Sequence, residues 1–100
     1  MELSEEIILQ TIFEVVDEVN KMLPEERRLQ KLPNTFLAGD TGNLDSLGVI
    51  NFIVELENRL QKDFGLNFNL IELLEMSEEP MKTIDRLAKF IQTRANGEGI

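Results

Sequence analysis

The chain contains neither histidine nor cysteine among its 100 residues. Without cysteine it forms no disulfide, no thiolate nucleophile and no zinc–thiolate site, so cysteine usage does not reveal its redox compartment. Without histidine it lacks the commonest general base and most transition-metal ligand sets. Carboxylates are adjacent at Glu78 and Glu79 and two apart at Glu55 and Glu57, but such neighbours do not share a helix face. The sequence therefore argues against an enzyme.

Basic residues and long apolar runs are also scarce. The chain has 10 basic and 19 acidic residues, for a formal net charge of -9. Such a surface repels a phosphate backbone and favours partners with basic patches, although acidity alone also keeps a protein in solution. No apolar run approaches the ~20 residues of a membrane span, and the start "MELSEEIILQ" has acids where a secretory signal needs bases. We expect no nucleic-acid partner, no membrane span and a cytoplasmic location.

The length predicts one domain, which we place at residues 1–94, followed by a disordered tail at residues 95–100. No segment shows the alternation of a strand over more than a few residues. The predicted fold class is all-α: a small four-helix bundle of three long helices and one short helix, with a long loop between the first two. We expect a monomer.

The first helix is predicted from Leu3 to about Leu23, with Ser4 as its N-cap and Pro24 ending it. Its inner positions recur every three or four residues at Ile8, Ile12, Val15, Val19 and Met22. The connection to Leu44 should be anchored by Leu29, Leu32, Phe36 and Leu37. Within it, "PEERRLQKL" could form a short helix.

The second helix is predicted from Asp45 to about Asp63. Asp45 is its expected N-cap, accepting from the N–H of Leu47 or Gly48, and Ser46 follows as the first helical residue. A short helix should follow around residues 70–76, and the last helix should begin between Ser77 and Thr83. The inner face of the last helix is predicted at Ile84, Leu87, Ala88 and Ile91.

Ser46 is the residue with the clearest functional possibility. Because Asp45 caps the helix, the serine hydroxyl stays free, and a helix N-terminus favours an esterified phosphate. Gly48 leaves the surface beside it uncluttered. The alternative is that Ser46 is an ordinary helix-start residue. The nearby acids do not have the spacing of a calcium loop, so we predict no metal site.

The stretch from Phe36 to Ile91 resembles the acyl carrier protein family, in which the motif Asp-Ser-Leu opens the second helix of a four-helix bundle. The motif stands here in "LDSL", while "VINFIVELENRLQKDFGLNF" and "TIDRLAKFI" resemble the family's second and last helices. The resemblance implies a 4′-phosphopantetheine arm on Ser46, attached from coenzyme A by a phosphopantetheinyl transferase. The thiol of that arm would hold an acyl group as a thioester.

The resemblance also implies sites beyond Ser46. The expected docking surface for acyl- or aminoacyl-transferring enzymes with basic patches comprises Asp45, Leu47, Ile50 and Glu57. Candidates for an acyl pocket are Ile53, Leu56, Leu74 and Ile84, for which ordinary core is the alternative. The arm would act as a flexible tether, so that partner enzymes docked on this surface meet the thioester at high effective concentration.

The second helix departs from many fatty-acid carriers, which have acids at the positions of Gly48, Asn51, Asn58 and Arg59. A glycine two residues after the serine resembles carriers that include the D-alanyl carrier proteins. We expect acyl cargo for fatty-acid, lipid or polyketide-type biosynthesis. D-alanyl or other aminoacyl cargo is the alternative, and an unmodified acidic helical adaptor is the alternative from another class.

Overall fold

The computed structural model describes residues 3–37, 44–75 and 79–96. These residues form three α-helices, α1 (Glu5–Asn20), α2 (Ser46–Phe64) and α3 (Ile84–Ala95), together with two 3₁₀ segments, η1 (Glu25–Arg27) and η2 (Leu70–Glu75). No strand occurs in the described ranges, where Phe36 and Thr83 form an isolated bridge. The all-α prediction is confirmed, whereas the predicted short helix around residues 70–76 is a 3₁₀ segment.

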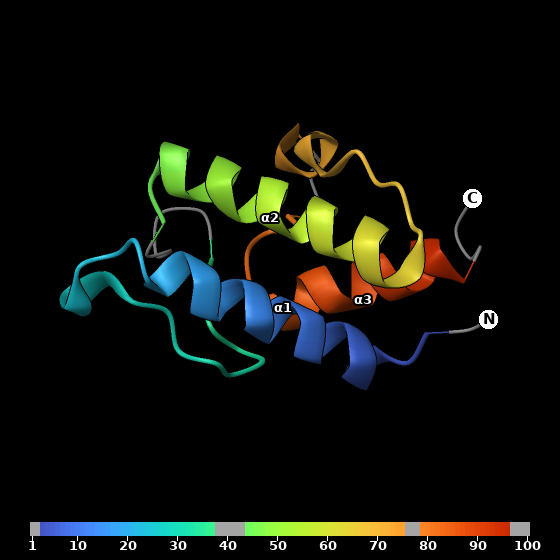
Figure 1. Ribbon diagram of the computed structural model, residues 1–100, viewed down its shortest axis with the longest axis horizontal. Coiled ribbons are helices and arrows are strands. Elements are labelled where there is room, and N and C mark those ends of the chain that lie inside the picture. Colours follow the sequence, from blue (N-terminus) through green and yellow to red (C-terminus); the bar gives the residue numbers. More distant parts are fainter. Residues whose placement is uncertain (1–2, 38–43, 76–78, 97–100) are drawn as a thin grey trace.

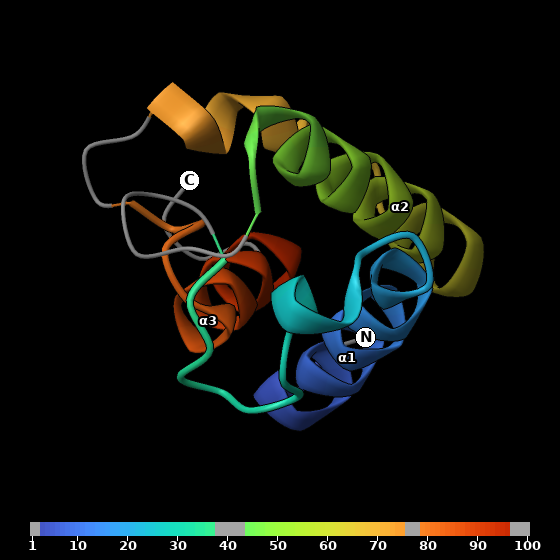
Figure 2. The same cartoon turned by 90° about the vertical axis from the view of Figure 1, so that its left-hand side faces the viewer.

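Helix α1 packs against both α2 and α3, and η2 packs against α2 (Figure 1). Seen end-on, α2 and α3 lie on different sides of α1, with η2 alongside α2 (Figure 2). The inner faces predicted from the sequence meet in one core. Its fully buried members on α2 and α3 are Phe52, Ile53, Leu56, Leu60, Ile84, Leu87, Ala88 and Ile91. Burial of each large apolar side chain stabilises the fold by about 1.5–3 kcal/mol.

The start of α1 is as predicted, but its end is earlier. Ser4 Oγ accepts the Ile7 N–H at 3.2 Å, which confirms the N-cap. The helix ends at Asn20, and the N–H groups of Met22 and Leu23 donate to carbonyls only three residues back. The residue before a proline avoids helical geometry, so the chain leaves the helix ahead of Pro24. Met22, predicted on the inner face, is 67% exposed.

The connection after α1 is anchored to the start of α3. Leu37 donates its N–H to Lys82 O at 2.8 Å, and the N–H of Asp85 donates to Pro33 O at 2.7 Å. Leu29 and Leu37 are buried as predicted, but Leu32 and Phe36 are exposed by 48% and 43%. The short helix suggested in "PEERRLQKL" is present only as η1. Residues 38–43 lie outside the described ranges.

The last helix begins where the sequence indicated, with Thr83 as its N-cap. It runs through Ala95, and the Asn96 side chain binds both backbone groups of Leu3, accepting its N–H at 3.0 Å and donating to its carbonyl at 3.2 Å. Ala95 and Asn96, which the sequence placed in the tail, are the last residue of α3 and its C-cap. Residues 97–100 lie outside the described ranges.

Candidate functional site

The start of α2 is built by three adjacent residues. Asp45 is the N-cap, and its Oδ1 accepts the Gly48 N–H at 2.8 Å, as the sequence predicted. Leu44, immediately before the cap, is buried with Val49 in the core, which fixes the direction in which the chain enters the helix. Ser46 is the first residue of α2. Its backbone is described, and its side chain is not.

Gly48 has a steric role in this cap. A Cβ atom at this position would lie 3.2 Å from Asp45 Oδ1 and 3.3 Å from Leu44 Cδ2. Both distances are shorter than ordinary van der Waals contact, so a larger residue would push against the capping carboxylate and the leucine. The glycine lets the cap and the buried leucine lie close to the first turn.

Beyond the cap, α2 exposes aliphatic side chains. Leu47 is 66% exposed and Ile50 is 41% exposed, so both are accessible, as is Asp45 of the same expected docking surface. Val54, which the sequence interpretation did not include, is 46% exposed. Its position seven residues after Leu47 was the signal that places it on the same face. The three residues form a stripe that begins beside Ser46, and we call it the aliphatic stripe.

Glu57, another residue of the expected docking surface, has a partner inside the protein. Its Oε2 accepts the Leu70 N–H at 2.7 Å, which joins α2 to the first residue of η2. Leu70 is 1% exposed, and Glu57 is half-buried. A hydrogen bond to a carboxylate is stronger than one between neutral groups, so this contact holds η2 on α2.

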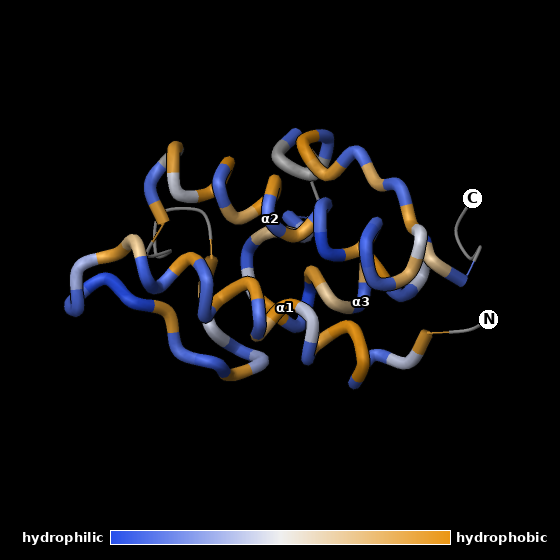
Figure 3. Tube along the Cα trace, in the orientation of Figure 1, coloured by the Kyte–Doolittle hydropathy of each residue, from blue (hydrophilic) through white to orange (hydrophobic). Residues whose placement is uncertain are grey.

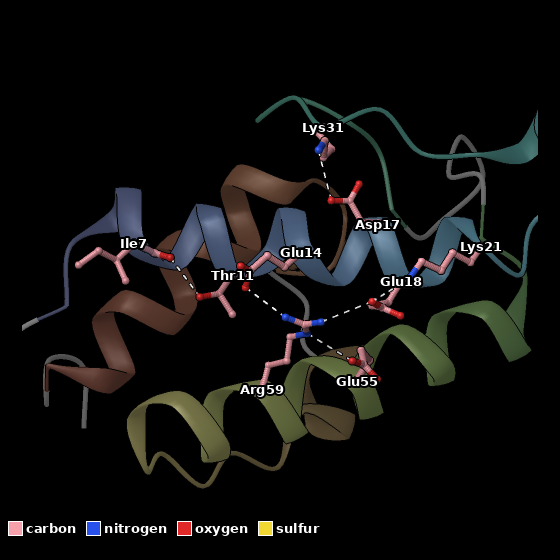
Figure 4. Close-up of polar contacts among 9 residues, drawn as sticks. All are labelled: Ile7, Thr11, Glu14, Asp17, Glu18, Lys21, Lys31, Glu55 and Arg59. Carbon is pink, nitrogen blue, oxygen red and sulfur yellow. Dashed lines mark hydrogen bonds and ion pairs between the residues drawn. The ribbon is translucent and has the colours of Figure 1, made fainter.

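Arg59 joins α2 to α1 through carboxylates of both helices (Figure 4). Its guanidinium lies 3.1 Å from Glu14 Oε1 and 3.8 Å from Glu18 Oε1 on α1, and 3.3 Å from Glu55 Oε1 on α2. The Arg59 side chain is 27% exposed. The sequence interpretation noted Arg59 only as a departure from acidic residues; the structure directs it and Glu55 toward α1.

The acyl-pocket candidates are only partly described. Ile53 and Leu56 of α2 and Ile84 of α3 are fully buried members of the same core. Leu74 belongs to η2, and its side chain lies outside what the structure describes. The three described residues thus lie together in the core that α2 and α3 share, and their part in an acyl pocket stays a prediction.

No helix within the described ranges is long and apolar enough to cross a membrane. The same residues contain no group of three or more carboxylates placed to hold a metal ion. Comparisons of the chain with protein families, curated proteins and solved structures gave no match.

Proposed function

We propose that this chain is a carrier protein of the acyl carrier type, with a 4′-phosphopantetheine arm on Ser46. The observation that carries the proposal is the start of α2: Asp45 caps the helix by accepting the Gly48 N–H, and Ser46 follows as the first helical residue. The serine hydroxyl is therefore not needed as the cap. In this proposal the fold is a four-helix bundle in which the 3₁₀ segment η2 takes the place of the short helix.

The first turn of α2 suits a phosphate esterified to Ser46. The first N–H groups of a helix have no acceptor within the helix, and together with the helix dipole they favour a negative group at this end. Asp45 Oδ1 accepts one of these, the N–H of Gly48. The arm, once attached, supplies the thiol that this cysteine-free chain lacks.

A carrier of this kind needs no catalytic group of its own. A phosphopantetheinyl transferase would move the arm from coenzyme A to the Ser46 hydroxyl, forming a phosphodiester and releasing adenosine 3′,5′-bisphosphate. Other enzymes would load and unload the thiol of the arm. The chain contributes a rigid attachment point and a tether that keeps the thioester near the partner's active site. This division of labour agrees with a sequence that has neither histidine nor cysteine.

The proposed cargo is an acyl group, used in fatty-acid, lipid or polyketide-type biosynthesis in the cytoplasm by a monomeric carrier. Its support is the aliphatic core that α2 and α3 share, including Ile53, Leu56 and Ile84. The feature that favours an aminoacyl cargo is Gly48. The close approach of Asp45 and Leu44 already explains a glycine at this position, so Gly48 does not require that cargo.

The proposal is tested by incubating the purified chain with coenzyme A, Mg²⁺ and a promiscuous phosphopantetheinyl transferase. Intact-mass analysis should show the addition of one phosphopantetheine group. The modified protein is then offered to acyl-acid and amino-acid ligases in parallel. Charging by fatty acids supports the acyl cargo, whereas charging by D-alanine alone would assign the aminoacyl one. No added mass would favour the unmodified adaptor.

A further inference from the structure

The outward face of α2 carries no charge over most of its length. Every exposed residue of this helix between positions 47 and 61 is uncharged, namely Leu47, Ile50, Asn51, Val54, Asn58 and Gln61. The whole chain has a formal net charge of -9 and 29% charged residues. Beyond Asp45, the exposed N-cap that precedes Ser46, the neutral face of α2 is therefore an exception to the composition of the protein.

The three charged residues in the same part of α2 have partners within the protein. Glu55 pairs with Arg59, and both lie toward α1. Glu57 accepts the Leu70 N–H at 2.7 Å. Each of these carboxylates is already bound to an internal donor through one of its oxygens, so it attracts a basic patch less than a free carboxylate would. The charges bordering this face of α2 are thus partly neutralised within the protein.

The aliphatic stripe offers a different kind of contact. Leu47, Ile50 and Val54 are 66%, 41% and 46% exposed and follow one another at three and four residues. Hydrophobic colour runs along the outer edge of the N-terminal half of α2, away from α1 (Figure 3). Exposed apolar patches of this kind mark interaction sites, and charged residues are depleted from the centres of protein interfaces.

We infer that the enzyme that acts at Ser46 receives the aliphatic stripe in an uncharged apolar groove, in place of the basic patch expected from the composition. The inference rests on the proposed function and names the partner chemistry of the same site. Burial of the stripe drives the association, so the affinity depends on its side chains and responds little to salt. The neutral polar residues Asn51 and Asn58 form the border of the contact.

The test uses a phosphopantetheinyl transferase with coenzyme A as the probe, and measures KM and kcat for the carrier by mass spectrometry. Ile50→Ser and Val54→Ser remove stripe residues away from the reacting serine. Ile7→Ser on α1 is the matched control, because Ile7 is 42% exposed and Ile50 is 41% exposed. We expect each stripe variant to raise KM about tenfold with kcat nearly unchanged, and the control to stay within about twofold.

Salt gives the second readout. KM of the wild type should change by less than about twofold between low salt and about 0.5 M NaCl. Equal KM values for the stripe variants and Ile7→Ser, or a steep rise of KM with salt, would overturn the inference. Thermal unfolding of each variant checks that it is folded.

Prolonged incubation with excess transferase separates the two proposals. A wild type that is never modified refutes both the carrier function and the groove. Complete modification of the wild type, with unaltered kinetics in the stripe variants, refutes the groove alone.

Discussion

The Glu57 carboxylate accepts the Leu70 N–H at 2.7 Å, across 13 positions of sequence. The bond fixes the first residue of η2 on the side of α2. Because η2 is a short 3₁₀ segment of six residues, it has few internal hydrogen bonds to hold it in place. Its attachment to α2 depends on this carboxylate and on the burial of the Leu70 side chain.

Replacing Glu57 by alanine should loosen η2. The Leu70 N–H loses a charged acceptor, so we expect the free energy of unfolding to fall by about 1–2 kcal/mol. Amide hydrogen exchange should accelerate at Leu70 more than in α1. Glu57→Gln keeps a neutral acceptor and should have a smaller effect. The control is Glu75→Ala, at an exposed acidic residue of η2; equal Leu70 protection in the two alanine variants would contradict the attachment.

Replacing Arg59 by methionine should weaken the contact between α1 and α2. The side chain is partly exposed, so the expected loss is about 1 kcal/mol at low salt, and it should shrink as salt screens the three carboxylates. Urea unfolding at two ionic strengths measures both effects. Lys62→Met removes the same charge from an exposed position of α2. Equal losses of stability in the two variants would show that the contacts of Arg59 with α1 do not stabilise the fold.

Replacing Asp45 by alanine should fray the start of α2. Loss of the cap typically costs about 1 kcal/mol, whereas Asp45→Asn retains an acceptor for Gly48 and should cost less. Asp63→Ala, near the other end of the helix, should be neutral or slightly stabilising because it removes a negative charge from the negative end of the dipole. Thermal unfolding compares the three. If Asp63→Ala lost as much thermal stability as Asp45→Ala, the stabilising role of Asp45 as N-cap would be contradicted.

Asn20 should be important for the connection after α1. Its side-chain amide donates to Leu29 O at 2.9 Å and accepts the Leu29 N–H at 2.8 Å. Asn20→Ala leaves the backbone N–H and C=O of the buried Leu29 without this partner. The free energy of unfolding should therefore fall by about 1–2 kcal/mol. Limited proteolysis should then cut the connection sooner. Asn34→Ala, at an exposed position of the connection, is the control and should behave as the wild type.

Local signals were sufficient to predict the three α-helices and the N-caps of α1 and α2, but not the end of α1 or the 3₁₀ geometry of η2. Ser4 and Asp45 cap α1 and α2 through their own side chains, so the signal lies within a few residues of the effect. Gly65 ends α2 with φ 68°, a left-handed conformation that favours glycine, while Leu66 N–H returns to Leu60 O. Periodicity alone placed the inner faces of α2 and α3.

Features set by distant residues were not predictable in this way. Arg59 and Glu14 lie 45 positions apart, and only the packing of α2 on α1 brings them together. The exposure of Leu32 and Phe36 depends on how the connection turns toward α3. At the candidate site the sequence predicted the cap, Leu47 and Ile50. Val54 was not predicted, because the apolar periodicity of α2 describes its buried face and Val54 lies outside that face.

The mass of the chain after exposure to coenzyme A and a phosphopantetheinyl transferase tests whether Ser46 carries the phosphopantetheine arm. Wild type and Ser4→Ala should each gain one phosphopantetheine group, while Ser46→Ala gains none. Ser4 is the matched control because it too stands at the start of a helix. Tandem mass spectrometry should place the group on the peptide that contains Ser46. An unmodified wild type, or a Ser46→Ala variant that is modified as fully as the wild type, would contradict the account.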